Sequence, residues 1–335
     1  MASFTRFGND LYTGARSFDI VGRRKIWYAI AVIAIAISVL GPVLRGGFTF
    51  GIEFTGGSEF HISGADTTDQ SLATDAVASI TDTPARVSVV GNDAIRVQTD
   101  TLEDGDQSAQ VRQALAEAYD VPSDDVTESF IGPSWGADIT TQAIRALLVF
   151  LALAAVVMAL YFRTWKMSLA ALIALLHDLV VTAGIYGITG FEVTPAAVIG
   201  FLTILGYSLY DTVVVFDKIR ENTTEDGSES RRTFGESVNL AVNQTLVRSI
   251  NTSIVAILPV ASILFIGAVL LGAGTLRDIA LALFIGILVG TYSTIFIAAP
   301  LYAHLREGEP AVKKADQRTL ATRKKAAVEQ QAVSA

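Results

Sequence analysis

Five long stretches of this chain contain no charged residue at all. They span Ile26–Leu44, Ala146–Phe162, Val193–Tyr210, Ser249–Leu276 and Ile279–Ala303. A helix needs roughly 20 apolar residues to cross the hydrocarbon core of a bilayer, so each run forms most or all of a span. Charged residues make up only 17% of the 335 residues, against about 25% in soluble proteins. We therefore predict a multi-pass membrane protein, which excludes a soluble enzyme.

These runs and their flanks predict six transmembrane helices. We expect them at residues 24–44, 139–162, 167–188, 195–217, 247–270 and 276–303, the last five forming one transmembrane region at 139–305. The first helix is too long for a signal-peptide core and no small-x-small cleavage site follows it, so it is expected to be an uncleaved anchor. The basic tail at 306–335 is expected to be disordered or a fraying helix.

Lysine and arginine are distributed unequally around these helices. They occur in the N-terminal segment 1–23 and at residues 24 and 25, between the second and third helices at 163–166, in a loop at 218–246, and in the tail. Loops rich in Lys and Arg remain in the cytoplasm. Both termini are therefore expected to be cytoplasmic, and the segment 45–138 to lie on the outer side.

The segment between the first two helices is acidic and has its own fold pattern. Residues 46–138 contain 17 Asp and Glu against 3 Lys and Arg. Their periodicity predicts, in order, a strand at 48–62, a helix at 66–80, strands at 86–90 and 94–99 around a turn at 91–93, a helix at 106–119 and a strand at 126–131. This β-α-β-β-α-β order is ferredoxin-like. The expected fold class is an α-helical membrane protein with six transmembrane helices and a small α+β extracytoplasmic domain.

Most cofactor sites require residues that this sequence lacks. Cysteine is absent, which excludes disulfides, iron–sulfur clusters and thiolate zinc sites. The three histidines are far apart, and the glycine pairs Gly46-Gly47 and Gly56-Gly57 are not followed by the Lys-Ser/Thr of a phosphate loop. We therefore expect no enzyme activity, no cofactor and no metal. Any work done by the protein would draw on a gradient of H⁺ or Na⁺.

Asp211 is the strongest candidate for coupling to such a gradient. Ionisable residues within spans are costly and usually functional. Asp211 precedes Lys218 by seven residues, which places it about 10 Å inside the membrane boundary at about 1.5 Å per residue. Tyr207 lies one turn earlier on the same helix face. Arg248, at a similar depth near the next span, is expected to form a proton-coupling pair with Asp211, and a purely structural ion pair is the alternative.

His177 and Asp178 lie near the middle of the third expected helix. Such a pair is difficult to place against lipid. It fits a proton relay and fits equally a polar clasp that hydrogen-bonds a neighbouring helix. The residues themselves leave both interpretations open.

Several stretches resemble the SecD/SecF family of membrane proteins. The sequence from Gly51 to Gly57 is similar to that family's Gly-Ile-Asp-Phe-Thr-Gly-Gly signature, with Glu53 in place of the usual Asp. The matching stretches further along are Ile131-Gly132-Pro133, Leu175–Asp178, Tyr207–Asn222 and Asn243–Arg248, the last two being of the SecF type. Two positions depart from the pattern, since Tyr210 stands where Asn is common and Val247 where Ser is common. The resemblance covers about residues 18–305.

The resemblance implies an accessory subunit of the bacterial Sec protein-export machinery in the cytoplasmic membrane, related in fold to the resistance-nodulation-division exporters. It implies a heterodimer with SecD, association with the SecYEG translocon, contact with translocating preproteins and use of the proton-motive force. YidC and YajC are further candidate partners, and no nucleic acid is expected. In the family, the residues that match Asp211 and Arg248 are linked to proton passage. The chain also lacks an internal repeat, whereas transporters are commonly built from paired repeats, so a partner half is expected.

Two other functions fit the same residues: half of a proton-driven exporter of small molecules or lipids, and a passive scaffold of the translocon. The outer domain favours protein export over small-molecule export, because it is small, acidic and has no pattern for an aromatic-lined pocket. We also expect this domain to move relative to the membrane. Its candidate hinges are Gly56 with Gly57, and Gly132 with Pro133, where glycine frees the backbone and proline restricts it.

The topology can be tested by cysteine labelling, because the chain contains no cysteine of its own. A single Asn92→Cys substitution in the acidic domain should react with a membrane-impermeant maleimide added outside intact cells, since the Lys and Arg distribution places this domain outside. Reaction of this residue only from the cytoplasmic side would contradict the predicted orientation.

Overall fold

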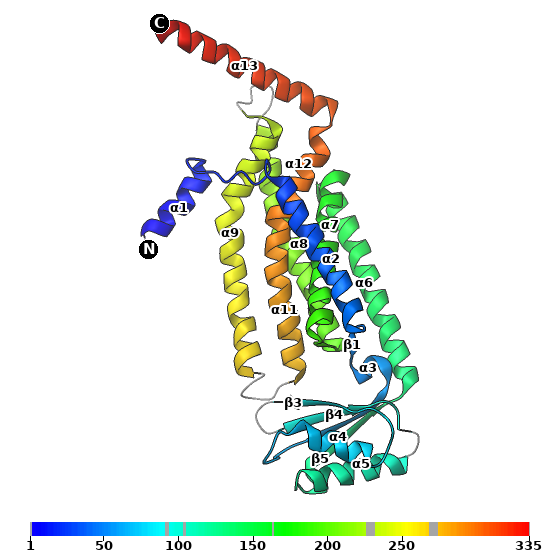
Figure 1. Ribbon diagram of the computed structural model, residues 1–335. Helices are drawn as coiled ribbons and strands as arrows, with labels where there is room; N and C mark the ends of the chain where they lie inside the picture. Colours follow the sequence, from blue (N-terminus) through cyan, green and yellow to red (C-terminus); the bar gives the residue numbers. More distant parts are fainter. Residues whose placement is uncertain are drawn as a thin grey trace.

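A bundle of long helices forms the body of the molecule, with a small domain of strands and helices at one end and two helical extensions at the other (Figure 1). The structure is a computed structural model that describes residues 2–90, 94–102, 105–162, 164–225, 232–267 and 274–334. Within these residues, six helical segments are long and apolar enough to cross a membrane. The predicted hairpin turn at 91–93 lies outside the described residues.

The six spans follow the predicted order. They are formed by α2 (Arg24–Arg45), α6 (Pro133–Phe162), α7 (Trp165–Thr189), α8 (Pro195–Glu225), α9 (Phe234–Ser262) continued by the π-helical turn η2 (Ile263–Gly267), and α11 (Gly274–Ser293) continued by the π-helical turn η3 (Thr294–Ala298) and α12 (Ala299–Glu307). Their ends differ from the prediction. The expected loop at 218–246 is mostly helical, since α8 continues to Glu225 and α9 begins at Phe234.

The early start of α9 has a local cause. Thr233 and Glu236 form a capping box, in which the Thr233 hydroxyl accepts from the Glu236 backbone N–H and the Glu236 carboxylate accepts from the Thr233 backbone N–H. This satisfies two of the N–H groups that a helix start leaves unpaired. Hydropathy locates the membrane-embedded part of a helix, whereas caps locate its ends. The predicted start at 247 and the observed start at Phe234 therefore differ by about three and a half turns.

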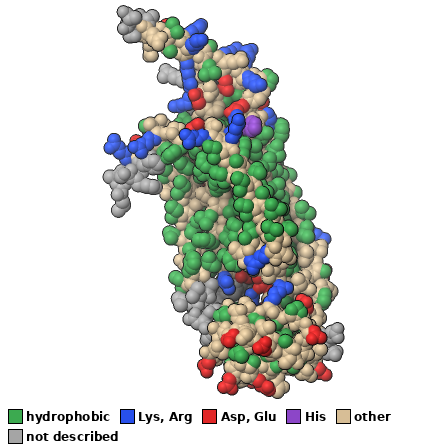
Figure 2. All heavy atoms as spheres, in the orientation of Figure 1, with side chains coloured by type: hydrophobic (Ala, Val, Ile, Leu, Met, Phe, Trp, Pro, Cys, Tyr) green, Lys and Arg blue, Asp and Glu red, His purple; other side chains and the backbone are tan. Residues whose placement is uncertain are grey.

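Helices α7, α8 and α11 form the centre of the bundle. In their most apolar windows 50%, 44% and 50% of the residues are buried, compared with 17% in α2 and 11% in both α6 and the α9 span. Close approach at the centre depends on small residues, because a Cβ on Gly200 or Gly286 would lie only 2.6 or 2.4 Å from a side-chain atom of the neighbouring helix. The peripheral helices expose the broad apolar belt seen in Figure 2.

The domain between α2 and α6 contains one antiparallel sheet of four strands in the order β3-β4-β2-β5. Its elements are β2 (Gly57–Ile62), α4 (Gln70–Ala78), β3 (Arg86–Val90), β4 (Ala94–Thr99), α5 (Gly105–Ala118) and β5 (Val126–Ile131). Alternation along the strands gives the sheet two different faces. Phe60 and Ile62 of β2 join a buried core with Leu115 of α5. The opposite face carries polar residues and is turned toward the bundle (Figure 1).

The six predicted elements of this domain occur in the predicted order, and the last three strands have the predicted bounds. The first strand is wrong in part. In place of one strand at 48–62, the chain forms β1 (Thr49–Phe50), the short helix α3 (Ile52–Thr55) and then β2. Strand β1 pairs in parallel with β6 (Glu192–Val193), which lies in the link between α7 and α8. The entry to the outer domain is therefore hydrogen-bonded to the bundle.

The residues between α1 (Ala2–Thr13) and α2, at 14–23, cross the end of the bundle opposite the outer domain, and we call them the N-terminal strap. Two asparagines of α9 hold this strap through its backbone. The Asn243 amide accepts from the Phe18 N–H at 2.7 Å and donates to the Phe18 carbonyl at 2.9 Å. Asn239 accepts from the Ile20 N–H at 2.9 Å. Neither α1 nor the strap was predicted.

Of the two alternatives predicted for the C-terminal tail, the structure shows the helical one, because residues 310–334 form one helix, α13 (Pro310–Ser334). Its first half is anchored to the start of α9. Asp316 accepts from the Phe234 N–H at 2.7 Å, and the Arg323 guanidinium donates to both carboxylate oxygens of Glu236 at 2.9 and 2.6 Å. Beyond Arg323 the helix is exposed through Gln331.

The neck of the outer domain supplies a stability prediction. Gly57 has φ +142°, and a Cβ there would lie 2.3 Å from the Thr99 carbonyl oxygen. We expect Gly57→Ala to destabilise the outer domain by roughly 1–3 kcal/mol, since the residue would be both strained and crowded. Gly132→Ala is the matched control, because a Cβ there meets open space. Limited proteolysis and thermal unfolding of the purified chain would measure the difference, and equal effects of the two substitutions would contradict this account.

Candidate functional site

A layer of polar side chains crosses the bundle where α7, α8, α9 and α11 meet. Its members are buried or half-buried residues within otherwise apolar spans. They are Asp178 of α7, Ser208, Asp211 and Thr212 of α8, Ser249 and Ser253 of α9, Thr291 and Ser293 of α11, and Thr294 of η3. Hydrogen bonds between helices connect them, and we call this set the polar layer.

Asp178 is the most fully bonded member of the polar layer. Its side chain is 1% exposed. Its Oδ2 accepts from the Ser208 hydroxyl at 2.6 Å and from the Ser293 hydroxyl at 2.8 Å, while its Oδ1 lies 3.2 Å from His177 Nδ1. One carboxylate thus joins α7 to α8 and α11. Of the two interpretations of this pair, the geometry favours the polar clasp.

Asp211 lies in the same layer but is only half bonded. Its side chain is 5% exposed. Its Oδ1 accepts from the Ser249 hydroxyl of α9 at 3.1 Å, whereas its Oδ2 is buried and, among the described residues, has no hydrogen-bond partner. The next residue, Thr212, is hydrogen-bonded to Thr294 at 3.0 Å. Helix α8 therefore carries one unsatisfied carboxylate oxygen within one turn of the Asp178 clasp.

Arg248 does not form the expected ion pair. It lies about four turns into α9 and is exposed on the surface of the bundle, and among the described residues no ion pair joins it to Asp211. It is close enough to Asp211 for electrostatic attraction. Ser249, the next residue, turns inward and takes the place at Asp211 that the sequence assigned to Arg248. The charges are adjacent without being in contact.

Two further predicted residues lie beside this layer with buried polar atoms that have no hydrogen-bond partner among the described residues. These atoms are the hydroxyl of Tyr207 and Nε2 of His177. The partners that sequence reasoning missed are the serines and threonines of α8, α9 and α11. Their signal was weak, because hydroxyl residues are common in transmembrane helices, where they also bond to their own backbone. The one sequence signal for them was the three-residue spacing of Ser208 and Asp211, which places these two side chains on the same face of a helix.

The predicted hinge residues lie together at the neck of the outer domain. Gly57 pairs with Ile131 in the β2–β5 register, and a Cβ on Gly56 would lie 3.0 Å from the Pro133 backbone. Gly132 alone among them has open space around it. The two covalent connections to the bundle therefore run side by side.

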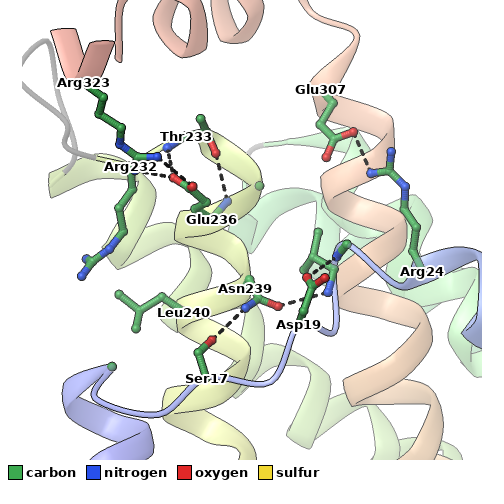
Figure 3. Close-up of a pocket in the computed structure, with 14 residues that line it drawn as sticks. Ser17, Asp19, Arg24, Arg232, Thr233, Glu236, Asn239, Leu240, Glu307 and Arg323 are labelled. Carbon is green, nitrogen blue, oxygen red and sulfur yellow. Dashed lines mark hydrogen bonds and ion pairs between the residues drawn. The ribbon is translucent and has the colours of Figure 1, made fainter. Parts of the chain in front are cut away.

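A cleft of about 500 Å³ opens at the opposite end, between the strap, α9, α12 and α13. Figure 3 shows that acidic and basic side chains alternate around it. Arg24 donates to Glu307 at 2.6 Å, and Arg323 pairs with Glu236. Because these charges neutralise one another in pairs, the cleft is better explained as a joint between four segments than as a ligand site. Within the described residues, no cluster of three or more His, Asp or Glu side chains could hold a metal ion.

The part of the sequence that forms most of this six-span bundle matches one family of membrane proteins. The family model "Protein export membrane protein SecD/SecF, C-terminal" matches residues 110–308, a range that includes every element from α6 to α12. The chain belongs to this SecD/SecF family, as its motifs indicated.

Similarity to individual SecF proteins extends over nearly the whole chain. The protein translocase subunit SecF of Streptomyces coelicolor is 44% identical over 330 residues, covering 96% of this chain and 86% of the relative. That of Mycobacterium tuberculosis H37Rv is 43% identical over 327 residues, covering 95% and 73%. The SecDF subunit of Thermus thermophilus is 30% identical over 300 residues, covering 85% of this chain and 38% of the relative.

Solved structures give the same result for the fold. The crystal structure of SecDF, a translocon-associated membrane protein from Thermus thermophilus, has a TM-score of 0.76 at 29% identity, and a super-membrane-facing form of SecDF has 0.62 at 27%. The matches cover 87% and 90% of this chain but only 39% and 40% of the SecDF chains. The chain therefore spans about two-fifths of these structures.

The clasp and relay interpretations of Asp178 can be separated by a stability measurement. Asp178→Ala removes the shared acceptor of Ser208 and Ser293, so we expect it to destabilise the bundle by roughly 1–3 kcal/mol. Asp178→Asn retains one carbonyl oxygen and should cost less. The matched control is Asp217→Ala, which removes an exposed carboxylate at the end of the α8 span. Thermal unfolding in detergent would measure the stability of all three variants. If Asp178→Ala is as stable as the control, Asp178 has no clasp role and the relay is the better interpretation.

Proposed function

We propose that the chain is an accessory subunit of the bacterial Sec protein-export machinery and uses the proton-motive force to promote preprotein translocation across the cytoplasmic membrane. The translocase names of its relatives support the export role. The observation that carries the proton role is Asp211, whose carboxylate is buried in a span with one oxygen unsatisfied and a guanidinium nearby. Such a group can gain or lose a proton without losing an ordered partner.

The outward position of Arg248 supports a heterodimer with SecD. Arg248 directly precedes the uncharged run Ser249–Leu276, and a guanidinium that faces lipid within a span is costly. Tyr210 of α8 is also 58% exposed, so the α8 and α9 spans present polar groups on the bundle surface. A partner subunit that covers them removes this cost. The relative from Thermus thermophilus is a SecDF protein, and the match to this chain covers only 38% of that protein's length.

The proton chemistry follows from the two side chains. Arginine remains charged in proteins, so Asp211 is the member that titrates. The Ser249 hydroxyl serves both protonation states, because it donates to the carboxylate and can accept from the carboxylic acid. Protonation removes the negative charge and with it the attraction to Arg248. The relative position of α8 and α9 then depends on the protonation state.

Contacts within the polar layer carry this change through the bundle. Ser208 of α8 is bonded to Asp178, and Thr212 of α8 is bonded to Thr294. A shift of α8 must therefore move or break bonds to α7 and α11. Packed helices of this kind pass between discrete arrangements more readily than they deform continuously. The π-helical turn at Thr294–Ala298 is a suitable place for such a change, since π-bulges are frequent at functional sites.

The outer domain completes the proposal. Its β-α-β-β-α-β order and its sheet order support a ferredoxin-like fold, and the positive-inside rule puts both termini in the cytoplasm. In this orientation the domain lies on the side where a preprotein emerges. We include SecYEG among the expected partners, with YidC and YajC as further candidates. A passive scaffold remains the alternative that the following experiment distinguishes.

Asp211→Asn should behave as a permanently protonated subunit. In vesicles reconstituted with the export machinery, we expect it to abolish the gradient-dependent stimulation of export while leaving assembly with partners intact, because an amide keeps the shape without titrating. Arg248→Lys should be less damaging than Arg248→Met, since it keeps the charge and loses only the planar fork.

Asp217→Asn provides the control, because it makes the same substitution at an exposed position of the same helix. It should retain full stimulation. If Asp211→Asn also retains full gradient-dependent export, the proton role is wrong and the scaffold becomes the better interpretation.

A further inference from the structure

The polar face of the outer sheet makes a charged contact with the bundle. Arg96 of β4 donates to Glu192 of β6 at 2.5 Å, with the two side chains 25% and 12% exposed. Gln98 of β4 donates to the other Glu192 oxygen at 2.7 Å and to Glu59 of β2 at 2.9 Å. Figure 2 shows basic and acidic side chains gathered in the narrow waist between the domain and the bundle.

The two partners of this contact lie differently relative to the covalent neck. Glu192 is beside the entry connection, since it pairs with Thr49. On the sheet side, Gly57 packs against the Thr99 carbonyl, and both connections to the bundle leave the sheet at that point. Arg96 precedes Thr99 by three residues of β4, which is roughly 10 Å at about 3.4 Å per residue. A domain that is joined at one end and held by an ion pair at this distance can rotate about its neck once the ion pair opens.

Glu192 is rigidly placed on the bundle side. It pairs with Thr49 in the β1–β6 ladder. Two residues later, the Thr194 hydroxyl accepts from the Ala197 N–H at the start of α8 and donates to Asp278 of α11 at 2.8 Å. The acceptor that holds the outer domain is therefore attached to the beginnings of α8 and α11, the two helices that carry most of the polar layer.

Acidic groups gather at this contact. Glu53 lies within electrostatic reach of two further carboxylates, Glu59 and Glu192, and of the Arg96 guanidinium. Burial raises the pKa of Glu53, and the nearby carboxylates of Glu192 and Glu59 raise it further. Its Oε2 is buried without a partner among the described residues. Removing the charge of Arg96 would leave the neutral Gln98 amide as the donor to Glu192 against the mutual repulsion of the acidic groups, so the closed contact would be weakened.

We propose that Arg96 and Glu192 form an ionic latch that holds the outer domain against the bundle, and that opening of the latch lets the domain turn about the neck at Gly57 and Ile131. The latch residues come from β4 and from the α7–α8 link, so the latch couples the sheet directly to the helices of the polar layer. This inference rests on the geometry of the interface and does not require the proposed export role.

Distance measurements on the purified chain in lipid nanodiscs test the latch. Spin labels are attached through Ser123→Cys, at the end of the outer domain remote from the neck, and Thr189→Cys, at the end of α7; both positions are exposed and the chain has no other cysteine. Double electron–electron resonance then gives the distribution of distances between them. Arg96→Gln and Glu192→Gln should each raise the ratio of long to short distances roughly fivefold or more, the factor expected for loss of a contact of this size.

Two comparisons isolate the ion pair. Arg112→Gln removes the same charge from an exposed position on α5 and should leave the distribution unchanged, whereas Arg96→Lys keeps the cation and should restore most of the short distances.

The two latch variants keep the test decisive if one of them fails to fold, because each removes one partner of the same ion pair. Short distances that persist in folded Arg96→Gln or in folded Glu192→Gln would overturn the latch. Because the readout is a distance in the isolated protein, its result is independent of any export assay.

Discussion

A carboxylate inside the hydrocarbon layer must be bonded by other side chains, because the backbone groups of transmembrane helices are already paired with one another. Asp178 meets this requirement with hydroxyls from α8 and α11, which fixes the faces on which the three central helices meet. A Cβ at Gly290 would lie 3.2 Å from Ser208, so even the small residues of α11 serve this approach. The peripheral helices α2, α6 and α9 then pack around a centre that is already determined.

Asp211 shows what happens when the same requirement is met only in part. It lies one turn from Ser208 on the same helix, yet only one of its oxygens has a partner. A fully bonded carboxylate rigidifies its surroundings, whereas a half-bonded one leaves a second protonation state accessible. The bundle thus combines a rigid anchor and a titratable group within one layer, and the outer contact at Glu192 connects to the helices of that layer.

Features set by residue composition and periodicity could be predicted from the sequence, and features set by packing could not. Uncharged runs located five of the six spans, and alternation located β3, β4 and β5, because both depend on local preference for lipid or for a buried face. The inward turn of Ser249 and the outward turn of Arg248 depend on the rotation of α9, which only tertiary contacts determine. The end of α8 and the start of α9 were predicted wrongly for a related reason, since hydropathy does not show where a helix that continues into water ends.

The N-terminal strap has a consequence for how the protein is made. Asn243 binds the backbone of Phe18 across 225 residues of sequence, so the strap is synthesised long before the helix that holds it. Until α9 has been synthesised and inserted, the strap has no amide groups to bind and its buried residues have no completed core. The asparagines bond mainly peptide groups of the strap, while Ile20 and Val21 bury their side chains in the core of the bundle. Docking of the strap is therefore a late step in the assembly of the bundle.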